Sequence, residues 1–539
     1  MRQDFTTILM EFEKKVIPLA RESNIAYFDA TISGKDEDFR RVADLEVKMS
    51  KIYADKTTFA KLREIRASGH IVDALLKRQL DLLYLAFLEK QLDEHRLEAI
   101  IRLQNKLENA FTTFRAKVNG KSYTDNEIDQ TLRSSLDENE LRTVWTASKD
   151  IGQHVAHDVI RLVKLRNSAA RELGFANYHS MKLELEEQDP EEIARLFDEL
   201  DGLTCDAFAQ LKREMDAILA AKYNCSVEQL MPWHYQNRFF QQAPAIYDVD
   251  LDAFYRSENL VELAVRYFAG LNLPIDDLIE RSDLFEKEGK YQHAYCTDID
   301  REGDVRVVCN IVPTHGWMNT MLHEYGHAVY DKFNDRTLPW LLREPSHTFT
   351  TEAIAMLFGR QAANPRWLRS IAGIPAEESN KLTEQLRKSL RLEQLVFSRW
   401  VQVMYRFETS LYQQPDQDLD TLWWKLVGRY QMIRRPEGRP APDWASKIHI
   451  ALYPAYYHNY MMGELLASQL HHYICTEVIR HGDTANESYA GRSDVGVWLR
   501  DKVFSVGRSV HWKDMITSAV GEALTPKYYA RQFVEQPML

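Results

Sequence analysis

Apolar residues recur three and four positions apart through most of the chain, with charged residues between them. This spacing places the apolar side chains on one face of a helix and predicts amphipathic helices rather than strands. The sequence therefore predicts a predominantly all-α fold. The clearest of these stretches are residues 38–49, 89–118, 140–173, 190–219 and 381–412.

One region breaks the helical pattern. Residues 292–298 and 304–311 flank the turn sequence DREGD, and the second arm, DVRVVCNI, is rich in valine. Residues of high β-propensity on both sides of a turn favour a β-hairpin. We therefore expect one small hairpin within the helical fold.

Length and charge narrow the class of protein. A single hydrophobic core stops growing near roughly 250–300 residues, so a chain of 539 residues is expected to form at least two lobes. The net charge of −12, without a basic stripe, argues against nucleic acid as a partner.

No apolar run is long enough for a membrane span, and the N-terminus does not look like a signal peptide. We therefore expect a cytoplasmic protein that does not bind membranes.

The strongest chemical signal is an HExxH motif, which comprises His323, Glu324 and His327. It lies in a predicted helix, where residues four apart share one face, so both imidazoles can bind one Zn²⁺. Glu324 lies beside that face, where it can take a proton from water. Alone, the motif is only moderately specific, since two histidines on a helix are more often ordinary surface or core residues.

A catalytic zinc site needs a third protein ligand and an open fourth position. Glu352 follows the second histidine by 25 residues and opens the helical segment TEAIAMLFGR, whose period points it inward. Glu344 is the rival ligand, but it lies in a loop next to Pro345. We predict one Zn²⁺ per chain, held by His323, His327 and Glu352.

The segment LPWLLREPSHTFTTEAIA, residues 338–355, resembles the angiotensin-converting-enzyme family of zinc dipeptidyl carboxypeptidases and, more distantly, the thimet-oligopeptidase family. The resemblance implies a gluzincin fold, with two helical lobes around a deep cleft and the hairpin near the active site. It also implies oligopeptide substrates and a single zinc-peptidase unit over residues 1–539. Within that unit we expect an N-terminal helical lid region at residues 1–120 and a catalytic segment at residues 292–475.

The same resemblance suggests roles for residues in a later part of the chain. The sequence DWASKIHI matches the family segment that supplies Lys447 as a clamp for the substrate C-terminal carboxylate and His449 as a donor to a substrate carbonyl. Downstream, Tyr460 aligns as the oxyanion donor and Tyr457 as a helper of Lys447, with neighbouring Tyr456 as the alternative to Tyr457. Without the resemblance, a lone lysine indicates a surface charge and clustered tyrosines indicate core packing.

His293 and Ala294, in the sequence QHAYC, fall on the predicted hairpin. His293 matches a family histidine that reaches the substrate from an edge strand. The main chain of Ala294 would bond an extended peptide by strand addition. The alternative for His293 is an ordinary exposed histidine on a strand.

Two departures from the family pattern leave alternatives open. No glutamine near Phe254 and Tyr255 matches the family's third carboxylate ligand, so exclusive release of dipeptides is in question. Met356 replaces a family aspartate behind the zinc histidines, so another acceptor must orient an imidazole. We predict zinc-dependent hydrolysis of short oligopeptides with release of C-terminal dipeptides. The alternatives are an oligoendopeptidase, a single-residue carboxypeptidase and a catalytically idle peptide-binding protein.

Overall fold

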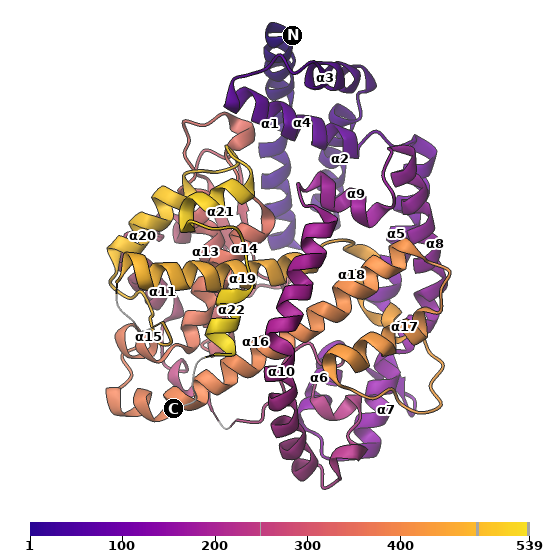
Figure 1. Ribbon diagram of the computed structural model, residues 1–539, viewed down its shortest axis with the longest axis vertical. Helices are drawn as coiled ribbons and strands as arrows, with labels where there is room; N and C mark the ends of the chain where they lie inside the picture. Colours follow the sequence, from indigo (N-terminus) through magenta and orange to yellow (C-terminus); the bar gives the residue numbers. More distant parts are fainter. Residues whose placement is uncertain (248, 481–483, 536–539) are drawn as a thin grey trace. The chain divides into compact units, whose positions relative to one another are not determined.

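The computed structural model describes residues 1–247, 249–480 and 484–535, except for the side chain of Glu94. Within this part of the chain, nearly all regular structure is helical (Figure 1). Two short sheets of two strands each complete it. The predicted all-α fold is confirmed. None of the helices in the described ranges combines the length and the apolar character that crossing a membrane requires.

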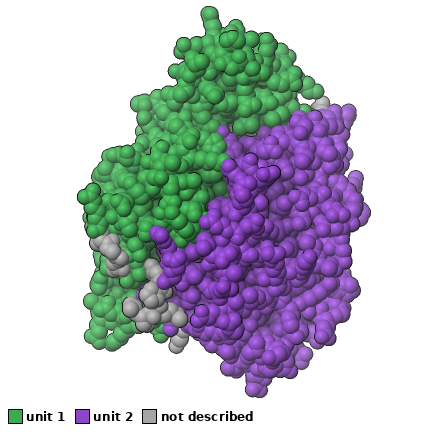
Figure 2. Space-filling view, viewed as in Figure 1, with its two compact units in different colours: residues 1–91, 249–386, 462–528 green, residues 92–248, 387–461, 529–539 purple. Residues whose placement is uncertain are grey.

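The chain folds into two compact helical units, each assembled from segments that are distant in sequence (Figure 2). The first unit comprises residues 1–91, 249–386 and 462–528, and the second comprises residues 92–248, 387–461 and 529–539. Two helical lobes were predicted from the chain length and from the family resemblance.

The first unit contains eleven of the labelled α-helices of the described residues in full. They are α1 (Arg2–Ser33), α2 (Asp36–Tyr53), α3 (Lys56–Ser68), α4 (Ala74–Glu89), α11 (Leu260–Gly270), α12 (Asp276–Arg281), α13 (His315–Lys332), α14 (Thr348–Gly359), α15 (Pro365–Ser370), α20 (Ser493–Leu499) and α21 (Trp512–Val520). Apolar side chains of α1, α3 and α4 form a core of their own, which includes Phe5, Phe12, Leu62, Leu83 and Phe87. The N-terminal helices are therefore a packed part of this unit.

Close helix packing holds α14 in place within the first unit. A Cβ atom at Gly326 of α13 would lie 2.8 Å from the Cα of Ala355, and one at Gly463 of α19 (His458–Tyr473) would lie 3.1 Å from the Cβ of Glu352. A side chain at Gly326 would clash with the backbone of α14, and one at Gly463 would crowd the side chain of Glu352. The two glycines therefore allow close packing against the helix that carries Glu352.

The second unit is built from α5 (Glu94–Thr113), α6 (Asp125–Ser134), α7 (Glu138–Ser148), α8 (Asp150–Glu172), α9 (Tyr178–Leu185), α10 (Pro190–Lys222), α17 (Leu419–Leu426) and α18 (Ile448–Leu452). Helices α16 (Ala376–Gln413), α19 and α22 (Lys527–Phe533) continue from one unit into the other. Helix α10 begins where the sequence predicts, because the Asp189 carboxylate accepts hydrogen bonds from two free N–H groups and Pro190 takes the first position.

Short helical turns connect these elements. The 3₁₀ turns are η1 (Val227–Gln229), η2 (Pro232–Tyr235), η3 (Leu251–Phe254), η4 (Trp340–Leu342), η5 (Arg360–Ala363) and η7 (Asp443–Ser446). The π turns are η6 (Val427–Gln431), η8 (Ile474–Val478) and η9 (Arg500–Phe504).

The predicted helix over residues 89–118 is wrong at both ends. Helix α4 ends at Glu89, and α5 begins after Asp93, whose carboxylate caps it. At the other end, β1 (Ala116–Val118) pairs with β2 (Lys121–Tyr123) around Asn119 and Gly120, which have φ angles of 51° and 81°. An Asn-Gly pair with positive φ favours a tight hairpin, and this turn outweighs the helical periodicity.

The other helical stretches agree better with their predictions. Residues 38–49, 190–219 and 381–412 fall within α2, α10 and α16. Residues 140–173 form two helices, α7 and α8, which meet at Lys149. The predicted β-hairpin is present as β3 (Tyr295–Asp298) and β4 (Val305–Val308), although its strands are shorter than the sequence pattern suggested.

Candidate metal centre

Helix α13 positions the two histidines of the HExxH motif. Its N-terminus is capped by Thr314, whose hydroxyl accepts a hydrogen bond from the N–H of Trp317. One turn of helix separates His323 from His327, and their ring centroids lie 4.9 Å apart with the planes at 82°. Both imidazoles therefore face the same point in space, as the four-residue spacing predicts.

Glu352 on α14 completes a group of three. Its Oε2 lies 3.6 Å from Nε2 of His323 and 3.9 Å from Nε2 of His327. The three candidate ligand atoms all lie within 4.8 Å of one another. Among the described residues, this is the only group of His, Cys, Asp and Glu side chains that meets this spacing.

The three side chains suit Zn²⁺ in chemistry as well as in spacing. Oε2 of Glu352 is buried without a hydrogen-bond partner, so an acceptor is left for a cation. Burial lowers the pKa of His323 to about 4, and burial, followed by the neighbouring His323, holds the pKa of His327 well below its usual value, so both imidazoles are neutral and their lone pairs are available. Burial raises the pKa of Glu352 to about 7, which a nearby cation would reverse. Two neutral imidazoles and one carboxylate are a donor set of catalytic zinc sites.

Glu344, the rival ligand, has other partners. Its carboxylate pairs with Arg301 and, at 3.2 Å, with Arg508. Burial alone would raise the pKa of Glu344, but these two charges hold it below its usual value. The structure therefore places Glu352, and not Glu344, with the histidines.

Glu324 lies beside the candidate ligands without being one of them. Its side chain is only 8% exposed. Burial, followed by the charge of Glu352, raises the pKa of Glu324 to about 8, while a hydrogen bond from the N–H of Cys296 lowers it. A divalent cation at the three ligands would favour the ionised form of this carboxylate.

Thr351 is the hydrogen-bond partner of one candidate ligand imidazole. The sequence did not identify this partner. Its Oγ1 lies 2.7 Å from Nδ1 of His327. Met356, which occupies the place of the family aspartate, offers only a thioether, a weak acceptor. The sequence signal for Thr351 is slight, since it is one of three threonines in the TFTTE run that leads to Glu352.

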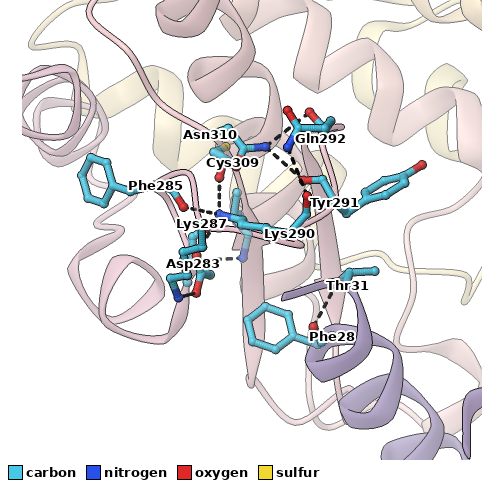
Figure 3. Close-up of polar contacts among 12 residues, drawn as sticks. Phe28, Thr31, Asp283, Phe285, Lys287, Lys290, Tyr291, Gln292, Cys309 and Asn310 are labelled. Carbon is cyan, nitrogen blue, oxygen red and sulfur yellow. Dashed lines mark hydrogen bonds and ion pairs between the residues drawn. The ribbon is translucent and has the colours of Figure 1, made fainter. Parts of the chain in front are cut away.

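A buried lysine anchors the segment that leads into β3 (Figure 3). Nζ of Lys290 donates hydrogen bonds to the Asp283 carboxylate at 2.7 Å and to the carbonyl oxygens of Asp283, Phe285 and Cys309. Nδ2 of Asn310 donates to the carbonyl of Tyr291 at 3.0 Å. These contacts tie the predicted substrate segment to the end of β4.

The free edge of β3 faces Glu324. The N–H of Ile299 donates to the carbonyl of Asp304, so the odd-numbered residues of β3 bond toward β4. The main-chain groups of even-numbered residues then point to the opposite edge. On that edge the N–H of Cys296 donates to Glu324, and Ala294 precedes it by two residues. His293 itself is exposed.

In the second unit, a glutamine lies beside Lys447, the predicted clamp for the substrate carboxylate. Nζ of Lys447 donates to Oε1 of Gln241 at 2.6 Å. The sequence has no glutamine near Phe254 and Tyr255, but Gln241 lies beside the lysine. Gln241 comes earlier in the chain than Phe254 and Tyr255, in an irregular segment where residue spacing carries little information. Tyr255 is instead a fully buried residue of the first unit, and its hydroxyl donates to a carbonyl.

Three more predicted residues gather near Lys447 in the second unit. The ring of Tyr457 lies 5.5 Å from Nζ of Lys447, and its hydroxyl accepts a hydrogen bond from Nε1 of Trp400 at 2.7 Å. The ring centroid of His449 lies 5.1 Å from that of Tyr457, and its Nδ1 is buried without a hydrogen-bond partner. The ring of Tyr460 lies 5.4 Å from that of Tyr457. The position of Tyr457 favours it over Tyr456 as the neighbour of Lys447.

The predicted site residues thus form two groups, one in each unit. The first unit contains the candidate ligands, Glu324 and the edge segment, and the second contains the lysine, histidine and two tyrosines. Sequence reasoning missed Thr351 in the first group and Gln241 in the second.

Comparison with known proteins adds the family. A peptidase family model described as angiotensin-converting enzyme matches residues 2–528. The chain is 22% identical over 511 residues to a protein of Theromyzon tessulatum named angiotensin-converting enzyme, covering 87% of this chain and 81% of that one. It is 21% identical over 440 residues to a Caenorhabditis elegans protein named inactive angiotensin-converting enzyme-related protein, covering 72% of this chain and 46% of that one.

Proposed function

This chain belongs to the peptidase family described as angiotensin-converting enzyme, and on that premise we propose that it is a zinc peptidase that releases dipeptides from the C-termini of short oligopeptides. The observation that carries the proposal is the convergence of His323, His327 and Glu352 beside Glu324. Neither a core nor a surface role accounts for three partly buried ligand atoms around one point.

The three ligands would hold Zn²⁺, whose chemistry here is Lewis acidity toward a carbonyl oxygen and water. Glu324 accepts the proton of the attacking water and later delivers it to the leaving amine. The hydrogen bond from the N–H of Cys296 orients the Glu324 carboxylate for this transfer. One side chain thus serves as base and then as acid within a single turnover.

The tetrahedral oxyanion needs donors that are already in place. We assign this role to the Tyr460 phenol and assign His449 as a donor to a substrate carbonyl, in both cases from the family resemblance. Burial, followed by the charge of Lys447, lowers the pKa of His449 to about 3, so the ring donates as a neutral imidazole. A preorganised donor to an oxyanion contributes roughly 10²–10³-fold to kcat.

The C-terminal carboxylate of the substrate is the proposed partner of Lys447, Gln241 and Tyr457. The lysine is 8% exposed, so its charge acts in a medium of low polarity. The hydrogen bond between Gln241 and Lys447 supports the proposal of dipeptide release. The main chain of Ala294 would bond the extended substrate, with His293 beside it.

Three other functions remain as alternatives. An oligoendopeptidase or a single-residue carboxypeptidase would use the same metal and base but place the cleaved bond differently. A catalytically idle peptide-binding protein is the third reading, and the nematode relative carries the word inactive in its name. The presence of Glu324 together with all three ligands favours an active enzyme.

The carboxylate clamp makes the first prediction. We expect peptides with a free C-terminus to be cleaved with kcat/KM roughly 10–100-fold above that of the same peptides with an amidated C-terminus, because a hydrogen bond to a charged group contributes about 1.5–3 kcal/mol. Mass spectrometry of the products should show C-terminal dipeptides. The Lys447→Met variant should lose most of this preference. Equal cleavage of acid and amide by the parent protein would contradict the clamp.

The preference should also depend on pH. Burial, and then the charge of Arg238, lowers the pKa of Lys447 to about 7, while Asp129 opposes this shift. Since only the protonated amine attracts a carboxylate, the preference should be largest below pH 7 and fall about tenfold per pH unit above it. Gln241 does not titrate, and burial raises the pKa of Tyr457, so neither produces this profile. Kinetics between about pH 6 and pH 9 measure it, with Lys447→Met as the flat control.

A further inference from the structure

We propose that Thr351 is the positioning residue of the metal centre: its hydroxyl fixes the tautomer and the ring orientation of His327 and thereby sets the affinity for zinc. The inference rests on the proposed function, since it requires that the site binds zinc. It assigns to a hydroxyl a role that the sequence left without a candidate.

The contact joins two helices whose separation is fixed. Nδ1 of His327 on α13 lies 2.7 Å from Oγ1 of Thr351 on α14. Thr351 directly precedes Glu352, so one turn of α14 supplies both a candidate ligand and the partner of another. The close approach of α13 and α14 at Gly326 keeps this distance constant. The hydrogen bond therefore ties the ring of His327 to the same turn of α14 that carries Glu352.

The bond decides which nitrogen of His327 is free. A hydroxyl bonded to Nδ1 leaves Nε2, the nitrogen 3.9 Å from Oε2 of Glu352, to face the metal position. With a metal on Nε2, the proton of the neutral ring sits on Nδ1 and is donated to the hydroxyl oxygen of Thr351. A partner on the second nitrogen is what orients most ligating histidines.

Thr351 has no counterpart on the other histidine. In the described part of the chain, no hydrogen bond to the ring of His323 is present, and its side chain is 27% exposed. Among the described residues, Thr351 therefore supplies the one hydrogen bond to a candidate ligand imidazole. Because a hydroxyl carries no net charge, its contribution is geometric and does not add to the charge of the site.

The test measures zinc binding without catalysis. Thr351→Val keeps the shape of the side chain and removes the hydroxyl, and we expect its zinc Kd to weaken about 10–100-fold. Thr351→Ser keeps the hydroxyl and should bind zinc within a few-fold of the parent. Competition with a chromophoric chelator measures the Kd of each variant.

The matched control is Thr350→Val. Thr350 is the buried neighbour on α14, and its hydroxyl donates to the carbonyl of His347 at 2.7 Å without touching a candidate ligand. It should retain the parent zinc affinity even if the fold is destabilised. If loss of any threonine hydroxyl here weakened zinc binding, both variants would show it. If the hydroxyl acts by positioning His327, only Thr351→Val would show weaker zinc binding.

The outcomes separate the two proposals. Parent-like zinc affinity in Thr351→Val would overturn the role of Thr351 and leave the proposed function intact. A parent chain that binds no zinc would overturn both. Should Thr351→Val fail to fold, Thr351→Ala serves the same comparison, since alanine also lacks the hydroxyl and cannot bind zinc.

Discussion

The Glu324→Gln variant is expected to bind zinc like the parent and to lose roughly 10²–10⁴-fold in kcat, the usual contribution of a general base. Glutamine has nearly the same shape as glutamate, so the buried position beside β3 stays filled. Its amide cannot accept the proton of the attacking water. Steady-state kinetics and metal analysis on the same preparation measure the two effects.

Each half of this result carries information. Turnover close to that of the parent would remove Glu324 as the base. Loss of zinc from the variant would mean that Glu324 itself binds the metal, contrary to the position of its side chain outside the ligand group. The expected combination, metal retained and turnover lost, also excludes an idle peptide-binding protein, since such a protein has no turnover to lose.

The Glu352→Gln variant is expected to weaken zinc binding by roughly 10³-fold or more, which corresponds to about 4 kcal/mol. The amide removes the only carboxylate among the three ligand side chains. It also removes the negative charge that makes the buried position attractive to a cation. Activity at limiting zinc should disappear with the metal, and part of it should return when zinc is in large excess.

Glu344→Gln is the matched control for this second result. It removes a carboxylate only eight positions earlier, but that carboxylate pairs with Arg301 and Arg508 instead of the histidines. Zinc affinity should be unchanged, and the free energy of unfolding should fall by about 1 kcal/mol or less, because the pairs are partly exposed. If Glu344→Gln lost zinc and Glu352→Gln retained it, the assignment of the third ligand would be wrong.

The helical fold could be predicted because helix periodicity is a local property. Three of the predicted stretches lie entirely within α2, α10 and α16. The failure at residues 116–123 has a local cause as well, since Asn119 and Gly120 form a turn that the apolar spacing does not reveal. The division of each unit into distant segments could not be derived, because it depends on long-range packing.

The candidate site divides in the same way. His323 and His327 could be predicted to converge because residues four apart lie about one helical turn apart. Glu352 could be predicted as the third ligand because the helical period of its own segment points it inward. Thr351 and Gln241 were missed because their contacts join residues 24 and 206 positions apart, and no spacing rule connects such positions. Tertiary packing alone brings these partners together.

Removing and restoring the metal tests the central claim most directly. The purified chain would be stripped with a chelator, titrated with Zn²⁺, and assayed on an oligopeptide at each step. The three ligands around one position predict that hydrolysis is absent from the stripped protein and returns in proportion to zinc up to one equivalent per chain. Full hydrolysis without metal, or a chain that binds no zinc at any concentration, would contradict the assignment.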